Sequence, residues 1–324
     1  MKPLLWPRVR ITTGHGTDAP AIAPLIISVS RATDIPGQMS SWFMERFGQG
    51  YVEWINPFNG KLQYVSFENV RVIVFWSKNP APMLPHLPVI HAKGITTLFQ
   101  LTLNDYEEEG FEPRIPPIEE RITTLRFLAG IVGKERVFWR FDPLILTSEI
   151  TPGKLLEKIS RIGNRIADSV CRLTVSFFSP YRTAVTRMRH RGILPLAPSE
   201  DALREIGSGL AELRKRWGIE IVTCAETNDL SRYGIHAGSC IDPAVIGKLA
   251  EHDALLTDFF PGFSSVSLFD TDESTLHRRL KDPGQRPLCG CMISKDIGQY
   301  GTCSSGCVYC YAQRSVRRAD GSTN

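Results

Sequence analysis

The sequence predicts an α/β protein built on a parallel β-sheet, and three observations carry that prediction. Apolar, β-branched segments alternate along the chain with segments of helical periodicity. The apolar segments are nearly continuous, which is typical of strands covered on both faces. Each ends in polar residues, and a helical stretch follows. We expect a TIM-type (β/α) barrel, complete or partial, rather than an open doubly wound sheet, because no glycine-rich phosphate-binding motif follows any strand.

The expected strands share a β-branched and aromatic composition. They lie in the segments 25–36, 70–80, 95–105, 136–143, 171–180 and 219–227. Helices between them have recognisable starts. Thr151 before Pro152 and Asp242 before Pro243 each pair an N-cap residue with proline at the first helical position. The helix expected from Ser199 has acidic residues in its first turn and basic residues in its last, which complements the helix dipole.

Composition and length fit one globular domain. The chain has 324 residues, of which 42% are hydrophobic and 22% charged, and its net charge of +4 does not by itself indicate nucleic-acid or membrane binding. No apolar run approaches the ~18 residues of a membrane span, and the N-terminus lacks a signal-peptide pattern. We therefore expect a cytoplasmic protein without membrane contact. The expected organisation is an N-terminal extension (1–24), a barrel domain (25–313) that includes a cysteine-rich loop (289–310), and a flexible tail (314–324).

Polar side chains gather where the expected strands end. In barrels and in open α/β sheets, the functional site forms at these C-terminal ends. The candidate catalytic residues at these ends are Arg31, Asp34, Lys78, Arg140, Asp142 and Glu226. Other polar residues at the same ends are Thr33, Asn79, Gln100, Thr102, Ser176 and Ser179. The three cations predict a pocket that can hold a carboxylate or a phosphate.

Cysteine clustering is the strongest chemical signal in the chain. Five of the eight cysteines lie between residues 289 and 310. In a reducing cytosol, clustered thiols more often bind metal than form disulfides. Cys303, Cys307 and Cys310 place three thiols on one loop, which Gly306 can bend tightly. Iron–sulfur clusters usually take four thiolates, so three local ligands would leave one iron open to a substrate or cofactor.

The segment "CSSGCVYCY" resembles the signature of the radical S-adenosylmethionine superfamily, including an aromatic residue, Tyr309, before the last cysteine. Its "CxYCYA" form is similar to the branch of spore photoproduct lyase and DNA-repair-photolyase-like proteins. In that superfamily the motif follows the first barrel strand, whereas here only 14 residues follow Cys310. Residues 25–312 also resemble a bacterial domain family of unknown function through the blocks "SRATDIP", "FWSKNPAPML", "WRFDP" and "GCMISKDIGQYGTCSSGCVYCYA". Together the two resemblances imply a permuted radical S-adenosylmethionine barrel.

The resemblance implies a particular chemistry. The loop's three cysteines would bind a 4Fe–4S cluster whose open iron chelates the amine and carboxylate of S-adenosylmethionine. A reductase or ferredoxin-type donor would supply the electron that cleaves the cofactor to a deoxyadenosyl radical, which abstracts hydrogen from a small-molecule or other unidentified substrate. Tyr309 would pack near the adenine, and Arg31, Lys78 or Arg140 could receive the carboxylate.

Four further cysteines form a candidate second set: Cys224, Cys240, Cys289 and Cys291. Because Cys224 follows an expected strand and Cys240 precedes an expected helix, both can reach one face, and we hypothesise an auxiliary iron–sulfur cluster. Cys289 and Cys291 are spaced more closely than the paired ligands of a usual zinc knuckle. The alternative is that Cys224 and Cys240 are small buried hydrophobes. Cys171 begins an expected strand and belongs to the core.

Two other functions stay open. A zinc site could use the three loop cysteines with Cys289 or Cys291 as fourth ligand, and the loop could instead hold a structural or redox-only iron–sulfur cluster. Either would make this a non-catalytic metal-binding protein. The basic stretch 186–192 and the basic tail could contact phosphate, which keeps a photolyase-like nucleic-acid repair enzyme as a third hypothesis.

Overall fold

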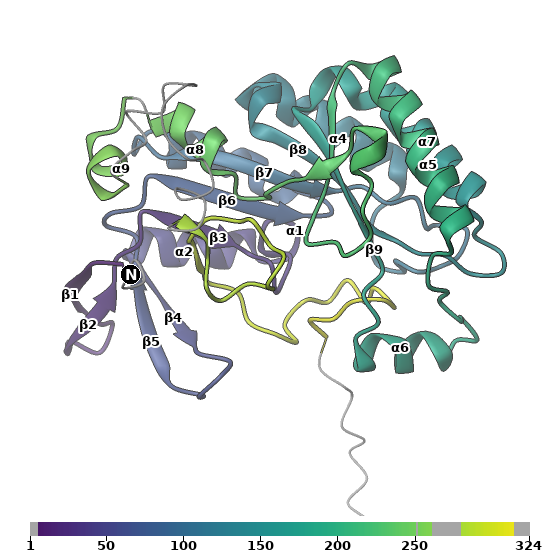
Figure 1. Cartoon of the computed structure of the whole chain (residues 1–324). Helices are drawn as coiled ribbons and strands as arrows, with labels where there is room; N and C mark the ends of the chain where they lie inside the picture. Colours follow the sequence, from purple (N-terminus) through teal and green to yellow (C-terminus); the bar gives the residue numbers. More distant parts are fainter. Residues whose placement is uncertain (1–5, 251, 261–279, 314–324) are drawn as a thin grey trace, which may run out of the picture.

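The computed structural model describes residues 6–250, 252–260 and 280–313 of the chain. The predicted tail (314–324) and the first five residues of the predicted N-terminal extension lie outside the described residues. Figure 1 shows a large central sheet with helices packed along it and a smaller sheet beside it. The fold is therefore a mixed α/β fold, as the sequence predicted.

Within the described residues, the larger sheet has eight strands, all paired in parallel. Its spatial order is β11 (His236–Ala237), β10 (Glu220–Thr223), β9 (Arg172–Phe177), β8 (Val137–Leu144), β7 (Thr96–Thr102), β6 (Val72–Ser77), β3 (Ile26–Val29) and β12 (Lys295–Asp296). Each strand expected from the sequence is present. In this part of the chain β11 and β12 form the two edges, so a closed barrel is not confirmed. From β3 to β11 the strands nonetheless lie side by side in chain order, without the reversal of a doubly wound sheet.

The smaller sheet has four strands in the part of the chain that the structure describes. Their order is β1 (Arg8–Thr12), β2 (Asp18–Ile22), β5 (Leu62–Ser66) and β4 (Tyr51–Ile55). The predicted N-terminal extension thus forms a β1–β2 hairpin that pairs with β5. Trp54 of β4 donates a hydrogen bond from its Nε1 to the Gly298 carbonyl, 3.0 Å away. The smaller sheet therefore contacts the C-terminal segment that carries the cysteine loop.

Helices follow most strands of the larger sheet. They are α1 (Ile35–Gln38), α2 (Ser40–Gln49), α3 (Leu87–His91), α4 (Ile118–Val132), α5 (Pro152–Ile166), α6 (Arg182–Arg189), α7 (Glu200–Trp217), α8 (Pro243–Ala250) and α9 (Ala254–Phe259). Short 3₁₀ turns span Ala81–His86, Lys134–Arg136, Ala167–Ser169 and Ser231–Tyr233. The predicted caps are confirmed: Thr151 Oγ1 accepts from Lys154 N at 3.3 Å, and Ser199 Oγ accepts from Ala202 N at 3.2 Å.

The two faces of the larger sheet bury different residues, because successive side chains of a strand point to opposite sides. Ile27 and Phe99 face the larger apolar core, which the helices α2, α4, α5 and α7 complete. Ile26 and Leu98 face a second core, which also contains Cys224, Cys240, Cys289 and Cys291. The candidate second cysteine set therefore lies against the sheet face that the main helices do not cover.

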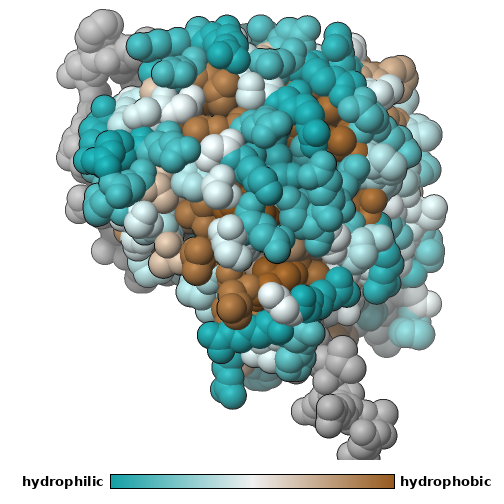
Figure 2. All heavy atoms as spheres, turned by 90° about the vertical axis from the view of Figure 1, so that its right-hand side faces the viewer, coloured by the Kyte–Doolittle hydropathy of each residue, from teal (hydrophilic) through white to brown (hydrophobic). Residues whose placement is uncertain are grey.

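Figure 2, which looks at the side where α5, α6 and α7 lie, shows hydrophilic areas interrupted by apolar patches. Exposed apolar side chains include Leu194 and Leu196, between α6 and α7. Among the described residues, no helix combines the length and apolarity needed to span a bilayer.

Candidate functional site

The predicted cysteine loop leaves the larger sheet directly after the edge strand β12. Asp296, the last residue of β12, lies opposite Ser28 of β3 in a parallel pair. Its carboxylate accepts from Ser28 Oγ at 2.7 Å, from Ser30 Oγ at 2.8 Å and from Arg31 N at 2.8 Å. Because β12 and β3 run in the same direction, the loop emerges where the parallel strands have their C-terminal ends, which is called the C-terminal edge of the sheet below. The polar strand-end residues lie at this same C-terminal edge.

The three loop cysteines lie in a partly buried bend. Cys307 is buried, whereas Cys303 and Cys310 are half-buried. Gly306 adopts a φ of 71°, in the left-handed region that favours glycine. Burial raises the pKa of Cys307 to about 12, so a metal that binds this sulfur must displace its proton. Among the described residues, no group of three or more histidine, cysteine, aspartate or glutamate side chains is arranged to hold a metal ion.

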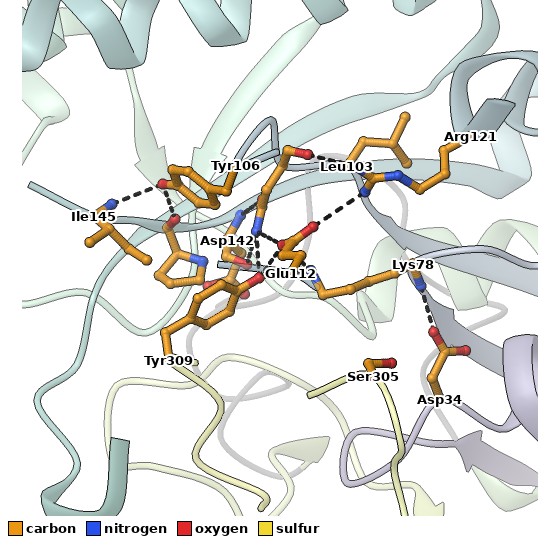
Figure 3. A network of polar contacts seen from close by, with 12 residues as sticks. Asp34, Lys78, Leu103, Tyr106, Glu112, Arg121, Asp142, Ile145, Ser305 and Tyr309 are labelled. Carbon is orange, nitrogen blue, oxygen red and sulfur yellow. Dashed lines mark hydrogen bonds and ion pairs between the residues drawn. The ribbon is translucent and has the colours of Figure 1, made fainter. Parts of the chain in front are cut away.

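Tyr309 anchors the loop through a buried polar network (Figure 3). Its hydroxyl accepts hydrogen bonds from Lys78 Nζ at 2.9 Å and from Asn104 Nδ2 at 3.0 Å, and donates one to Glu112. Burial and the neighbouring Glu112 carboxylate raise the pKa of Tyr309 well above its usual value. The hydroxyl therefore stays protonated and ties the loop to the sheet. Tyr309 was expected to pack near an adenine, but its hydroxyl is engaged within the protein.

Glu112 is the centre of this network, and the sequence did not single it out. Its carboxylate accepts from Lys78 Nζ at 2.8 Å and lies 3.5 Å from Arg121 Nη1. Burial alone would raise the pKa of Glu112, but Lys78 and Arg121 outweigh burial and hold the pKa below its usual value. Glu112 sits in an acidic segment that resembles a solvated loop, so composition gave no signal. Asn104, which ends a predicted strand, could have been selected by the strand-end criterion.

Arg187 of α6 fixes the other side of the loop. Its Nε donates to the Val308 carbonyl at 3.0 Å, and its Nη2 donates to the Cys310 carbonyl. Val308 N in turn donates to the Phe111 carbonyl at 3.0 Å. Arg187 belongs to the basic stretch that could have contacted phosphate or formed a solvated loop. In the structure this arginine instead holds the backbone beside two cysteines.

The predicted carboxylates lie at the same sheet edge but have different surroundings. Asp34 caps α1 and accepts from Ser77 Oγ at 2.7 Å and Lys78 N at 2.9 Å; burial raises its pKa. Asp142 accepts from Arg140, and although burial alone would raise its pKa, Arg140 and Ser176 hold the pKa below its usual value.

Glu226 follows β10 at this edge. Its carboxylate accepts from Phe177 N at 2.9 Å and from Asn228 Nδ2 at 3.2 Å. Burial raises the pKa of Glu226 above its usual value. Glu226 and Asp34 thus share a raised pKa and partial exposure to solvent, and neither has an ion pair within the described residues, whereas Asp142 is paired with Arg140.

The three predicted cations have different nearest partners. Lys78 is held by Glu112 and Tyr309 beneath the cysteine loop. Arg31 and Arg140 instead lie over the Trp76 ring, at 5.2 and 5.3 Å from its centroid. Arg140 also donates to Cys240 Sγ and pairs with Asp142, whose pKa is lowered by both Arg140 and Lys78.

The second cysteine set is assembled in the structure. Cys224 Sγ lies 3.3 Å from Cys240 Sγ. Cys224 and Cys291 both lie close enough to Cys240 to raise the pKa of its thiol, and Cys291 also raises the pKa of Cys289. The hydrogen bond from Cys240 and the nearby Arg140 charge lower the pKa of Cys224 to about 7. Cys171, predicted as a core residue, is half-buried beside the same apolar core.

Exposed aromatic rings next to the loop were not predicted. The Tyr311 ring lies 5.4 Å from the Tyr181 ring and 6.3 Å from the Tyr300 ring, measured between centroids. Each of these side chains is more than 40% exposed. The Tyr311 hydroxyl donates to the Arg31 carbonyl at 3.0 Å, which places the rings beside the strand-end residues. Their contacts join distant parts of the chain, so local sequence could not reveal them.

Comparison with known proteins identifies the family. The model of the family described as "Domain of unknown function (DUF1848)" matches residues 26–312, so the chain belongs to this family. The comparison with curated proteins gives no match.

Two solved structures show weak likeness to this chain. One is a proposed alpha-L-fucosidase from Bacteroides thetaiotaomicron, with 12% identity and a TM-score of 0.26 over 60% of this chain and 83% of that one. The other is the cellulose synthase subunit Z of Clostridioides difficile, with 11% identity and a TM-score of 0.26 over 61% of this chain and 78% of that one. At these values neither carries an argument about this protein.

Proposed function

We propose that this protein is an iron–sulfur enzyme of the radical S-adenosylmethionine type, with Cys303, Cys307 and Cys310 as ligands of a 4Fe–4S cluster. The observation that carries the proposal is the position of the loop directly after β12, at the C-terminal edge of a parallel sheet. In the superfamily that the motif resembles, the cysteine loop also follows a strand of the sheet, the first one. When β12 is counted first, the strands run in consecutive order from β12 to β11. This order supports the proposal of a permuted, partial barrel.

The loop has the donor set that such a cluster requires. It offers three thiols on one short bend, and iron–sulfur clusters are held by cysteine thiolates. Three protein ligands leave one iron for a further ligand, and when bound the cluster would supply the electron for reductive cleavage of S-adenosylmethionine. The bend itself is held by the Arg187 and Tyr309 contacts, which involve none of the three sulfurs. The backbone that carries the three cysteines would therefore be held in place before iron arrives.

The chain's own residues would position the cofactor and keep water out. The buried Lys78–Glu112–Tyr309 network fills the space beneath the loop, which limits access of solvent from the sheet side. Tyr181 and Tyr311 present exposed rings beside the loop, and aromatic rings can stack a purine base. We assign to these rings the adenine contact that the family resemblance implies for Tyr309. Glu226, with its raised pKa, would be the proton-holding group at this edge.

Anaerobic purification tests the proposal directly. The protein should be brown, and after reduction with dithionite it should convert S-adenosylmethionine to deoxyadenosine. Cys307→Ala should abolish deoxyadenosine release, whereas Cys171→Ala, which removes a cysteine outside the loop, should leave it unchanged. A protein that contains stoichiometric zinc would be a non-catalytic metal-binding protein. Salt-dependent DNA binding without cofactor cleavage would favour the nucleic-acid hypothesis, and cleavage by the Cys307→Ala variant would refute the site.

A further inference from the structure

Two buried thiols lie in direct contact where β11 is the outermost strand of the larger sheet. Cys224 follows β10, and Cys240 follows β11. Both are free cysteines, and their sulfur atoms lie 3.3 Å apart. The two residues are only 6 and 4% exposed. The fold thus holds two thiols from different segments against each other, apart from the cysteine loop.

The distance between these sulfurs suits a bond between them. A disulfide bond is ~2.05 Å long, so the sulfurs would have to approach by roughly 1.2 Å, which is within the reach of small side-chain rotations. The ligands of an iron–sulfur cluster are instead spread around its metal atoms. The contact between Cys224 and Cys240 therefore fits a dithiol better than the shared cluster hypothesised from the sequence.

The segment that carries Cys240 is attached to the sheet by few contacts. β11 comprises His236–Ala237 alone, and both residues are exposed. Directly after it, Gly238 N donates to the Thr223 carbonyl at 2.8 Å. Short edge elements with exposed hydrogen bonds open locally at a low free-energy cost. Cys240 can therefore close on Cys224 without disturbing the central strands.

The backbone directly after Cys224 has an unusual conformation. Ala225 has a φ of 50°, in the left-handed region that residues other than glycine seldom adopt. Such conformations cluster at functional sites. Ala225 and Glu226 are half-buried and Thr227 is exposed, so the chain leads from Cys224 to the surface within a few positions. A water-sized oxidant can therefore approach Cys224 from the C-terminal edge of the sheet.

Arg140 gives the two sulfurs different roles. Its guanidinium, which is paired with Asp142, also donates to Cys240 Sγ. The thiol hydrogen of Cys240 can then point at Cys224 Sγ, which accepts it. This chain of donors stabilises negative charge on Cys224, and the thiolate is the nucleophilic form of cysteine. Cys224 is therefore the attacking sulfur, and Cys240 is the thiol that completes the disulfide.

We propose that Cys224 and Cys240 are a redox-active dithiol, which a hydroperoxide such as hydrogen peroxide converts to a disulfide. In the first step Cys224 Sγ attacks a peroxide oxygen, the O–O bond breaks, and water leaves a sulfenic acid on Cys224. In the second step Cys240 Sγ attacks the Cys224 sulfur, the S–O bond breaks, and the hydroxyl leaves as water with the Cys240 proton. Both thiols are thus oxidised, and both peroxide oxygens are reduced to water. A small thiol reverses the bond by thiol–disulfide exchange when the β11 segment opens.

Peptide mapping by mass spectrometry after brief exposure to hydrogen peroxide tests the pair. Trypsin cleaves after lysine and arginine, so it separates Cys224, in residues 217–232, from Cys240, in residues 233–248. The disulfide should therefore appear as a linked pair of peptides in the oxidised wild-type protein. Treatment with dithiothreitol should remove the linked pair. Absence of this pair from oxidised wild-type protein would overturn the proposal.

The dithiol uses no residue of the cysteine loop, so it does not rest on the proposed function. The triple variant Cys303→Ala/Cys307→Ala/Cys310→Ala separates the two. It should lose release of deoxyadenosine but keep the linked peptides. If wild type shows the linked peptides and releases no deoxyadenosine, only the proposed function fails. If wild type releases deoxyadenosine and shows no linked peptides, only the dithiol fails.

Two serine variants test the order of the steps. Cys240→Ser keeps the attacking sulfur but cannot form the bond, so dimedone, which traps sulfenic acids, should label Cys224. Cys224→Ser should lose the linked peptides and leave Cys240 unlabelled, whereas the control Cys171→Ala should keep the linked peptides. Circular dichroism establishes whether each variant is folded, and the wild-type mapping needs no substitution. Dimedone on Cys240 in folded Cys224→Ser, or a wild-type disulfide to Cys289 or Cys291, would contradict the assignment.

Discussion

Tyr309→Phe is the substitution that isolates the anchor of the cysteine loop. It removes only the hydroxyl that contacts Lys78, Asn104 and Glu112 and keeps the buried ring. Hydrogen bonds to charged groups contribute about 1.5–3 kcal/mol each. Lys78 and Glu112 remain paired at 2.8 Å in the variant, so neither charge is left alone. We therefore expect a loss of about 2 kcal/mol rather than the sum of three bonds.

The loss can be measured by thermal unfolding of the metal-free protein. An unfolding entropy of about 2.1 cal/mol/K per residue gives ~0.7 kcal/mol/K for the whole chain, so Tm should fall by ~3 °C. Tyr181→Phe is the matched control, because the Tyr181 side chain is 41% exposed, and its Tm should change by less than ~1 °C. A double-mutant cycle with Glu112→Gln should give a coupling energy of ~1 kcal/mol or more. Equal Tm shifts for the two tyrosine variants, with no coupling to Glu112, would refute the anchoring role.

Three other substitutions test the site. Gly306→Ala should lower the free energy of unfolding by ~1–2 kcal/mol, because Gly306 has a φ of 71°. The control Gly48→Ala, in the helix α2, should raise the free energy of unfolding by ~0.5–1 kcal/mol. Equal effects of the two substitutions in denaturant unfolding would contradict the strained conformation at Gly306. Arg187→Met should shorten the lifetime of loop-bound iron under chelator challenge, and an unchanged lifetime would exclude its positioning role. The pKa of Glu226 is higher in the folded protein than in the unfolded chain, where it is ~4.3. The stability that protonated Glu226 contributes is therefore complete below pH ~4.3 and is lost as the pH rises through the folded-state pKa. Glu226→Gln should therefore be more stable than wild type at pH 7 and show no advantage near pH 4; an equal difference at both would contradict the assignment.

The sequence predicted the main strands well because each is a continuous apolar run that suits a buried parallel sheet. It did not predict β11 and β12, since a two-residue strand is defined by its partner rather than by its composition. The smaller sheet was also missed. Its strands alternate exposed and buried residues weakly, and β4 pairs with β5 across an exposed turn.

The candidate site was predictable where chemistry is local and unpredictable where it depends on long-range contact. The loop cysteines were selected by their spacing in the sequence. The proximity of Cys224 and Cys240 was predicted because one follows an expected strand and the other precedes an expected helix. The role of Tyr309 did not, because its partners Lys78 and Glu112 lie far away in the chain. Charge alone also grouped Arg31 with Lys78. In the fold, Arg31 lies over the Trp76 ring, whereas Lys78 contacts Glu112.

The most direct test of the account is a spectrum of the loop cluster with and without cofactor. In the Cys224→Ala/Cys240→Ala variant, the reduced cluster should give an electron paramagnetic resonance signal that changes when S-adenosylmethionine is added, because an iron with no cysteine ligand can bind the cofactor. A signal that stays the same, or iron that persists in this variant when Cys307 is also changed to alanine, would contradict an open iron held by the C-terminal loop.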